Sequence, residues 1–205
     1  AKKGVKFLGW TEVGTADIVG KKPYLVPADV KGLKAASASN KVSAAMWSTL
    51  GANPTPIGIT EIASAFQTGL TDINSTVVTF YLPSGLAKVA PVLSRVELSD
   101  APGIILMNKA AYDKLPAAER AALDKAIARR PATQLRQEIR GFEATLRDMH
   151  VKAGGTIATP TPEQREEWRK VLQPVWPKMV QEVGGDAQNF YKQMEAARAS
   201  CDKKS

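Results

Sequence analysis

The sequence has one cysteine, one histidine and no long apolar segment, and each of these scarcities excludes a class of protein. Cys201 has no second cysteine with which to form an internal disulfide, and a reactive thiol would need a histidine or a positive pocket beside it. The single histidine, His150, lies in a charged stretch, so we expect no catalytic Cys–His pair. No apolar run approaches the roughly 20 residues that a membrane-spanning helix needs.

The first residues, Ala1–Gly4, are not followed by an apolar segment of the kind found in secretory leaders. We therefore expect no signal peptide in this chain. Both a cytoplasmic protein and a protein whose leader has been removed or left out fit this pattern.

The balance of charge is basic, with 28 Lys and Arg against 20 Asp and Glu, a formal net charge of +8. Such a charge favours an anionic partner. The basic residues are scattered, however, and no aromatic residues alternate with them as a nucleic-acid stacking surface requires. No helix-turn-helix, zinc-ligand or RNA-binding signature is present. We therefore predict a solvated basic surface and no nucleic-acid partner.

The sequence also lacks the motifs of the common enzyme classes. It has no phosphate-binding loop, no HExxH pair and no cluster of metal ligands. The carboxylates of Glu61 and Asp72 are separated by the end of a predicted helix, with no adjacent base or nucleophile. We predict that the protein is not an enzyme, has no catalytic residue, and binds no metal or cofactor.

Strands are predicted mainly in the first half of the chain, where β-branched and aromatic residues form short apolar runs. The predicted strands are 4–10, 76–81, 96–98 and 103–108. Two helices are predicted between them. One runs over 41–50 after the cap residue Asn40 and before Gly51, and the other begins at Thr60 and ends at Gly69.

Helices dominate the second half. Pro116 begins one that ends at Arg129–Arg130, and residues 132–153 form a long amphipathic helix. Its predicted apolar side consists of Leu135, Ile139, Phe142, Leu146 and Met149. A short strand over 156–158, a helix over 162–172, a continuation toward Val183 and a last helix after Asp186 complete the pattern. This alternation favours an α/β fold with a mainly parallel sheet and flanking helices.

Four segments, taken together, resemble one family. They are GVKFLGW (4–10), PADVKGLK (27–34), LGANPTP (50–56), and EIASAFQTG (61–69) with Asp72 after it. In this order and spacing they are similar to consecutive motifs of the DctP-like solute-binding proteins of TRAP-type (tripartite ATP-independent periplasmic) transporters. Each motif alone is weak, but the set is specific.

This resemblance implies a periplasmic protein with a type II-like solute-binding fold, in which two lobes close around a small-molecule ligand and deliver it to membrane subunits. Residues 1–92 and 131–205 would form the second lobe. Residues 93–130 would be the remnant of a truncated first lobe, and a long helix would bridge both. The ligand would lie between the lobes, where small-molecule sites are frequent.

The sequence departs from the family at the positions that hold a carboxylate ligand. Family members carry arginines at the positions of Ala36 and Ala16, and often an asparagine at that of Thr76. An arginine forms two hydrogen bonds with a carboxylate, and alanine forms none. We therefore expect a ligand that is not a typical carboxylate but is neutral, larger or more apolar.

The residues expected to contact this ligand are Trp10, Glu12, Ser37, Ser39, Thr76 and Tyr81. For Trp10 and Tyr81, packing in the core is the competing interpretation, because aromatic side chains are usually structural. For the set as a whole, the competing interpretation is a solvated cleft that has lost its ligand.

A different function is possible for a chain with a truncated lobe. Strand edges that the missing part leaves open invite pairing between copies. The alternative prediction is therefore an interaction protein without a transport function. It would form a homodimer through the truncated lobe and exchange helices from the 132–153 region.

Overall fold

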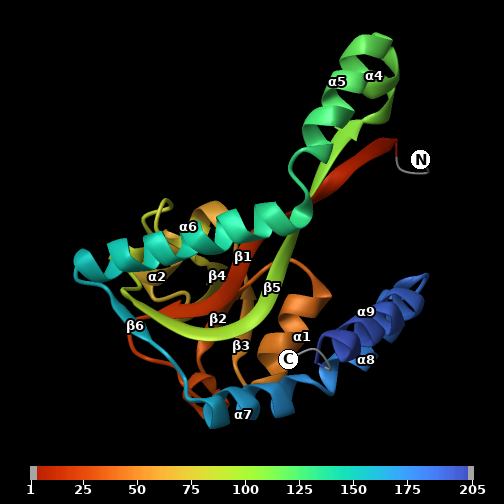
Figure 1. The fold of residues 1–205 in the computed structure, drawn as a ribbon. Coiled ribbons are helices and arrows are strands. Elements are labelled where there is room, and N and C mark those ends of the chain that lie inside the picture. The colour runs from red at the N-terminus through yellow and green to blue at the C-terminus, as the bar shows by residue number, and fades with distance from the viewer. Residues whose placement is uncertain (1–3, 203–205) are drawn as a thin grey trace.

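The computed structural model describes the backbone of residues 4–202 and the side chains of residues 4–200 (Figure 1). Its strands are β1 (Val5–Gly20), β2 (Lys34–Ser37), β3 (Asn53–Pro56), β4 (Ile73–Val77), β5 (Val92–Asn108) and β6 (Thr156–Ala158). Its helices are α1 (Lys41–Thr49), α2 (Ile62–Thr68), α3 (Val78–Tyr81), α4 (Lys109–Lys114), α5 (Ala117–Ala128), α6 (Ala132–Lys152), α7 (Pro162–Leu172), α8 (Val175–Val183) and α9 (Ala187–Asp202). Short 3₁₀ turns occupy Pro27–Val30, Ile59–Glu61 and Leu86–Lys88.

The strands described form one mixed sheet in the order β3-β2-β4-β1-β5-β6. Strand β2 runs parallel to β3 and β4, and β6 runs parallel to β5. Strand β1, in contrast, is antiparallel to both β4 and β5. The predicted α/β fold with flanking helices is therefore confirmed, although the central strand reverses the direction of the sheet. Nothing in the local sequence of β1 encodes the direction of its neighbours.

The longest strands, β1 and β5, pair with each other far beyond the rest of the sheet. Strand β4 pairs only with residues 16–20 of β1, and β6 only with residues 92–94 of β5. The remaining two-stranded ribbon, with α4 and α5 packed on it, projects from the body of the molecule (Figure 1). We call residues 4–12 and 101–130 the arm. The strands predicted over 96–98 and 103–108 are both parts of β5, which contains a bulge where Glu97 has a φ of 57°.

Both helices predicted between these strands are present, although Thr60 does not cap the second one, which begins at Ile62. Asn40 Oδ1 accepts a hydrogen bond from the Ser43 amide at 2.8 Å and begins α1. Gly69 ends α2 with a φ of 70°, a left-handed conformation that glycine adopts without steric cost. Within residues 4–202, no helix is both long and apolar enough to cross a membrane.

The strand predicted over 76–81 is wrong in its second half. Strand β4 ends at Val77, and residues 78–81 form the helical turn α3. Tertiary contacts favour the turn over the local β propensity. Val78 and Tyr81 are fully buried, and the Thr79 hydroxyl donates to the Val13 carbonyl of β1 at 2.8 Å.

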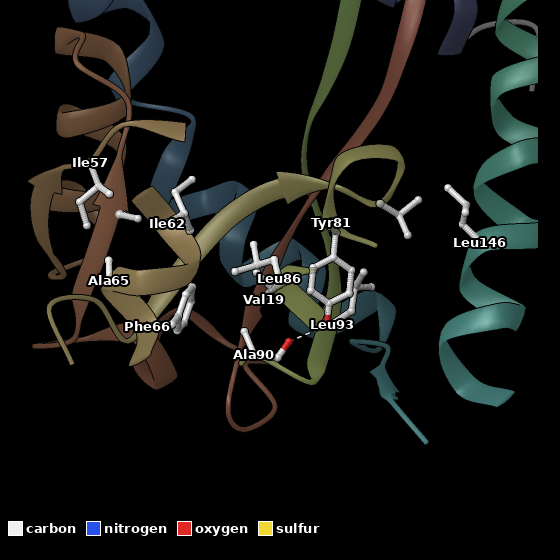
Figure 2. Close-up of a cluster of buried hydrophobic side chains, with 12 residues drawn as sticks. Val19, Ile57, Ile62, Ala65, Phe66, Tyr81, Leu86, Ala90, Leu93 and Leu146 are labelled. Carbon is white, nitrogen blue, oxygen red and sulfur yellow. Dashed lines mark hydrogen bonds between the residues drawn. The ribbon is translucent and has the colours of Figure 1, made fainter. Parts of the chain in front are cut away.

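Hydrophobic clusters cover both faces of the sheet, because neighbouring residues of a strand point to opposite sides. Val19 and Ala36 belong to the cluster under α2, α3 and α6, which Figure 2 shows. Their neighbours Ile18 and Ala35 belong to the cluster under α1 and α7, which is centred on Trp47.

The long helix α6 confirms the prediction for 132–153 but not its apolar side. Leu146 is buried, whereas Phe142 and Met149 are 49% and 57% exposed. Glu143 and His150 are buried in their place. The inward face meets main-chain polar groups of the sheet: Glu143 accepts from the Thr15 amide, and His150 Nε2 lies 3.0 Å from the Pro91 carbonyl oxygen. Apolar periodicity therefore identified the helix but not the side that packs.

Candidate functional site

A cavity of about 690 Å³ lies where the parallel strands β2, β3 and β4 end. Ser37 is the last residue of β2, Ile57 follows β3, and Thr76 is near the end of β4. Ligands of open α/β sheets bind in this place, outside the carboxyl ends of parallel strands. The volume is within the range of small-molecule sites. We call it the sheet-end cavity.

The loop from Ser37 to Ser43 forms one wall of the sheet-end cavity. Ser37 Oγ lies 3.0 Å from the Ala38 carbonyl oxygen and 3.1 Å from Ser43 Oγ. The Ala38 amide donates to Ser43 Oγ at 3.2 Å, and the Asn40 cap fixes the start of α1. These short-range bonds hold the polar end of β2 and the first turn of α1 as one rigid edge.

The described wall of the cavity combines polar and apolar side chains and carries no charged group. No residue described as lining it is Asp, Glu, Lys, Arg or His. The hydroxyl and amide side chains are Ser37, Ser39, Asn40, Ser43, Asn74, Ser75, Thr76 and Ser99. The larger apolar side chains are Val42, Met46, Trp47, Ile57, Ile59, Ile62, Phe80 and Trp176. Such a wall can bind a neutral ligand through hydrogen bonds and apolar contacts.

Three of the six predicted ligand contacts lie together in this wall. Ser37, Ser39 and Thr76 all line the sheet-end cavity, from the end of β2, the loop after it and β4. Ala36 also lines the cavity, and its side chain is 4% exposed. Ala16 pairs with Val77 in the sheet but is not among the residues that line the cavity.

The other three predicted contacts lie elsewhere. The Tyr81 side chain is fully buried in the core, where its hydroxyl donates to the Ala90 carbonyl at 2.5 Å (Figure 2). Burial also raises the pKa of Tyr81. Trp10 is 51% exposed on the arm, with its ring edge-on to that of Phe7. Glu12 lies at the base of the arm.

Glu12 belongs to a network of ion pairs between β1 and α6. Arg136 Nε donates to Glu12 Oε2 at 2.8 Å, and Arg140 Nη2 lies 2.5 Å from Glu12 Oε1. Arg140 also pairs with Asp100 of β5 at 2.6 Å. The carboxylate of Glu12 is nearly inaccessible to solvent, so its two arginines compensate a buried charge. This arrangement supports a structural role at the base of the arm.

A second carboxylate, Glu143, lies deeper in the same network. It is fully buried, accepts from the Thr15 amide at 2.8 Å, and pairs with Arg140 and Arg147 at 3.5 and 3.6 Å. Gly14 makes room for it, because a Cβ at Gly14 would lie 2.5 Å from Glu143 Oε1. The Glu143 carboxylate of α6 can therefore occupy this position only because residue 14, in the bulge of β1, is a glycine.

The sequence interpretation missed most of the residues that line the sheet-end cavity, and two of them, Asn74 and Trp176, show why. Asn74 lies two residues before Thr76 in β4, and its only signal is a polar side chain within a strand. Trp176 comes from α8, about a hundred residues farther along the chain, and no local pattern connects it with β4.

A second cavity, of about 730 Å³, lies between β5 and helices α7, α8 and α9. Its wall is largely apolar, and its aromatic members are Trp168, Trp176, Phe190 and Tyr191. Trp176 and Val42 line both cavities, so α1 and α8 form the partition between them.

Comparison with known proteins gives relatives over nearly the whole chain. The C4-dicarboxylate-binding periplasmic protein DctP of Vibrio cholerae is 29% identical over 185 residues, which are 90% of this chain and 55% of that protein. The protein of the same description from Rhodobacter capsulatus is 30% identical over 189 residues, again 90% and 55%. This chain thus spans about half the length of these relatives.

The fold has close counterparts among solved structures. The periplasmic ectoine-binding protein of the TeaABC TRAP transporter of Halomonas elongata aligns with a TM-score of 0.83 and 21% identity. The alignment covers 95% of this chain and 63% of that one. At this identity the likeness concerns the fold alone.

The sequence model of the bacterial extracellular solute-binding proteins, family 7 (DctP), matches residues 1–182. This match covers all four motifs that carry the resemblance and most of the helical second half. The chain therefore belongs to this family, the DctP-like solute-binding proteins of TRAP transporters.

Proposed function

We propose that the chain is the ligand-capturing part of an extracytoplasmic solute-binding subunit of a TRAP-type transporter. The sheet-end cavity is the single observation that carries this proposal: it joins the predicted contacts Ser37, Ser39 and Thr76 in one small-molecule-sized site. Family membership supports the transport role, and relatives named as periplasmic support a periplasmic location. The ligand would then be delivered to membrane subunits.

The chemistry of the cavity supports binding without catalysis. Several serine hydroxyls line the cavity, but none of the described lining residues is a histidine, a lysine or a carboxylate that could act as a base for them. The proposal therefore retains the prediction that the protein is not an enzyme.

The proposed ligand is not a simple carboxylate. A carboxylate buried in this cavity would meet no cationic side chain in the described wall, and desolvation of an unpaired charge is costly. Two relatives are described as C4-dicarboxylate-binding proteins, but that description applies to those proteins and not to this chain. Here the wall favours a neutral molecule.

Replacing Ala36 by arginine is expected to create the missing carboxylate contact. The Ala36 side chain is buried at the cavity wall, so an arginine there would extend into the cavity. We expect the affinity for succinate, measured by titration calorimetry, to rise at least about tenfold, because hydrogen bonds to charged groups contribute about 1.5–3 kcal/mol.

Ala38→Arg is the matched control, since Ala38 also lines the cavity but is exposed. It adds the same charge at the rim, and we expect it to change succinate affinity much less. Micromolar binding of succinate by the natural chain, left unchanged by Ala36→Arg, would contradict the carboxylate argument.

The division into lobes is part of the proposal. Residues 1–92 and 131–205 would form the second lobe, and residues 93–130 the remnant of the first. The projection of α4 and α5 on the arm, away from β2, β3 and β4, supports this division for 103–130 (Figure 1). The pairing of residues 5–12 with 102–108 links the beginning of the chain to the same arm.

A second candidate function is supported by the surface of the arm. Phe7, Trp10, Ile104 and Leu106 form an exposed apolar row on the ribbon, each 45–51% exposed. Phe7 pairs with Leu106 and Trp10 with Ile104 across the strands. This row supports the alternative of a homodimer that no longer transports. Native mass spectrometry distinguishes the two: a monomer with a defined extra mass supports ligand capture, and a ligand-free dimer supports the alternative.

A further inference from the structure

The second cavity is bordered by the apolar faces of two neighbouring helices. We call this cavity, of about 730 Å³ between β5 and helices α7, α8 and α9, the helix cavity. Trp176, Val180 and Val183 of α8 line it at intervals of four and three residues, and Phe190 and Met194 of α9 at an interval of four. Residues at these intervals lie on one face of a helix. Two helix faces of the kind that packs in a core therefore border a space of small-molecule size.

The turn between α8 and α9 sets this geometry. Gly184 and Gly185 both have a positive φ, 67° and 58°, which two successive residues with side chains rarely adopt. The turn places α9 against α8, and α8 packs on α1 (Figure 1). The apolar side chains of Val183, Phe190 and Met194 are nonetheless 55–65% exposed. Exposed apolar side chains gathered in this way mark binding surfaces.

The charge of the helix cavity distinguishes it from the sheet-end cavity. Its described lining residues include three arginines and two glutamates, one of which, Glu97, is paired with Arg95 and Arg165 at 2.9 and 2.5 Å. Arg169 has, among the described residues, a single ion pair, 3.6 Å from Glu166, which is too long for a hydrogen bond. The Arg169 side chain is 52% exposed, so its guanidinium can donate to an anion at the rim of the cavity.

We propose that the helix cavity is a second binding site, which takes an amphipathic anion: a molecule with an aromatic body and one carboxylate or sulfonate group. The body lies between α8 and α9, and the anionic group lies at Arg169. Trp176, Phe190 and Tyr191 favour a flat ring system, because aromatic rings pack on one another in favourable geometries. The net charge of +8 favours an anion over a cation. This inference goes beyond the proposed function and does not depend on it, because the transported ligand is assigned to the sheet-end cavity.

The four tryptophans of the chain make binding at the two cavities distinguishable. Trp168 lines only the helix cavity, Trp47 only the sheet-end cavity and Trp176 both, whereas Trp10 lies on the arm. The indole N–H groups of Trp168 and Trp47 donate to main-chain carbonyls at 2.8 and 3.2 Å, so each is held in one environment. In ¹H–¹⁵N correlation spectra, 2-naphthoate is expected to shift the indole signals of Trp168 and Trp176. The signals of Trp47 and Trp10 should stay in place.

Titration calorimetry tests the charge of the ligand. We expect 2-naphthoate to bind at least about threefold more tightly than 2-naphthamide, which has the same ring system without the charge, because a partly exposed ion pair contributes modestly. Arg169→Gln should remove this preference. Lys170→Gln is the matched control, since it removes the neighbouring exposed charge, which does not line the cavity, and it should retain the preference.

A second substitution tests the apolar contact. Phe190→Glu is expected to weaken 2-naphthoate binding at least about tenfold, because it removes an apolar surface and adds a like charge. Phe142→Glu is the matched control and should leave binding unchanged. Phe142 is exposed to a similar extent, 49% against 56%, but lies on α6. Both phenylalanines are outside the buried core, so both variants should fold.

Several results would overturn the inference. Shifts confined to Trp47 and Trp176 would assign the anion to the sheet-end cavity and would also contradict the neutral ligand proposed there. Equal binding of 2-naphthoate and 2-naphthamide would remove the role of Arg169. No shift of the Trp168 signal, up to the solubility of 2-naphthoate, would end this inference alone and leave the proposed function standing. A dimer in sedimentation experiments that Phe190→Glu dissociates would assign the apolar faces to a second copy of the chain instead.

Discussion

Replacing Glu143 by alanine is expected to destabilise the protein by about 3–5 kcal/mol, as observed when one partner of a buried ion pair is removed. Glu143 is fully buried, and the substitution leaves the Thr15 amide without its acceptor and Arg147 without its carboxylate. Equilibrium unfolding in urea measures the loss. The midpoint urea concentration of unfolding should fall, while the dependence of the unfolding free energy on urea concentration should change little.

Glu138→Ala is the control for this substitution, because it makes the same chemical change on the same helix. Glu138 pairs with Arg130 and Gln134 at the surface, where an ion pair contributes about 0–1 kcal/mol. If both substitutions cost the same, the network between β1 and α6 would not contribute to stability as we argue.

The importance of Glu143 shows where sequence interpretation ends. The helix over 132–153 was predictable from its apolar periodicity, and α1 and α2 from the cap residues Asn40 and Gly69. The charged residue that faces inward was not predictable, because its partner is the main chain of Thr15, 128 residues away. Gly14, which makes room for it, has no distinguishing local pattern.

The candidate site was predicted in part, and for a similar reason. Ser37, Ser39 and Thr76, which the sequence analysis expects to contact the ligand, line the sheet-end cavity at or near the ends of β2 and β4. Residues without a motif, such as Asn74 and Trp176, became visible only when the sheet and α8 brought them to one wall. Tyr81 lies in the core, as the competing interpretation of its aromatic ring has it, because the turn α3 directs that ring inward.

The sequence also did not predict how Asp17, an acidic residue buried on β1, is accommodated. Asp17 is next to Ile18 in a strongly apolar stretch of the strand, and the sequence gives no sign of its partner. In the structure its carboxyl Oδ1 accepts from the Glu97 amide at 3.0 Å, within the bulge of β5. The other oxygen, Oδ2, is buried and makes no hydrogen bond with the described residues.

Asp17→Asn is therefore expected to stabilise the protein at neutral pH. Burial raises the pKa of Asp17 from 3.8 to about 6, against the opposing effects of the Glu97 amide, Arg147 and Arg95. Because the folded state holds the proton of Asp17 more tightly than the unfolded state, protonated Asp17 contributes favourably to the free energy of unfolding. This contribution is fully present below pH 4 and is lost as the pH rises through 6. A pKa difference of about two corresponds to about 3 kcal/mol.

The measurement compares unfolding free energies of the natural chain and Asp17→Asn between pH 4 and pH 8. Asparagine retains an oxygen acceptor for the Glu97 amide and cannot ionise, so the variant should gain about 3 kcal/mol relative to the natural chain over this range. Asp148→Asn, on the exposed side of α6, controls for the loss of one carboxylate and should give a nearly constant difference. A difference for Asp17→Asn that stays constant, or grows toward low pH, would contradict a buried carboxyl that resists ionisation at this position.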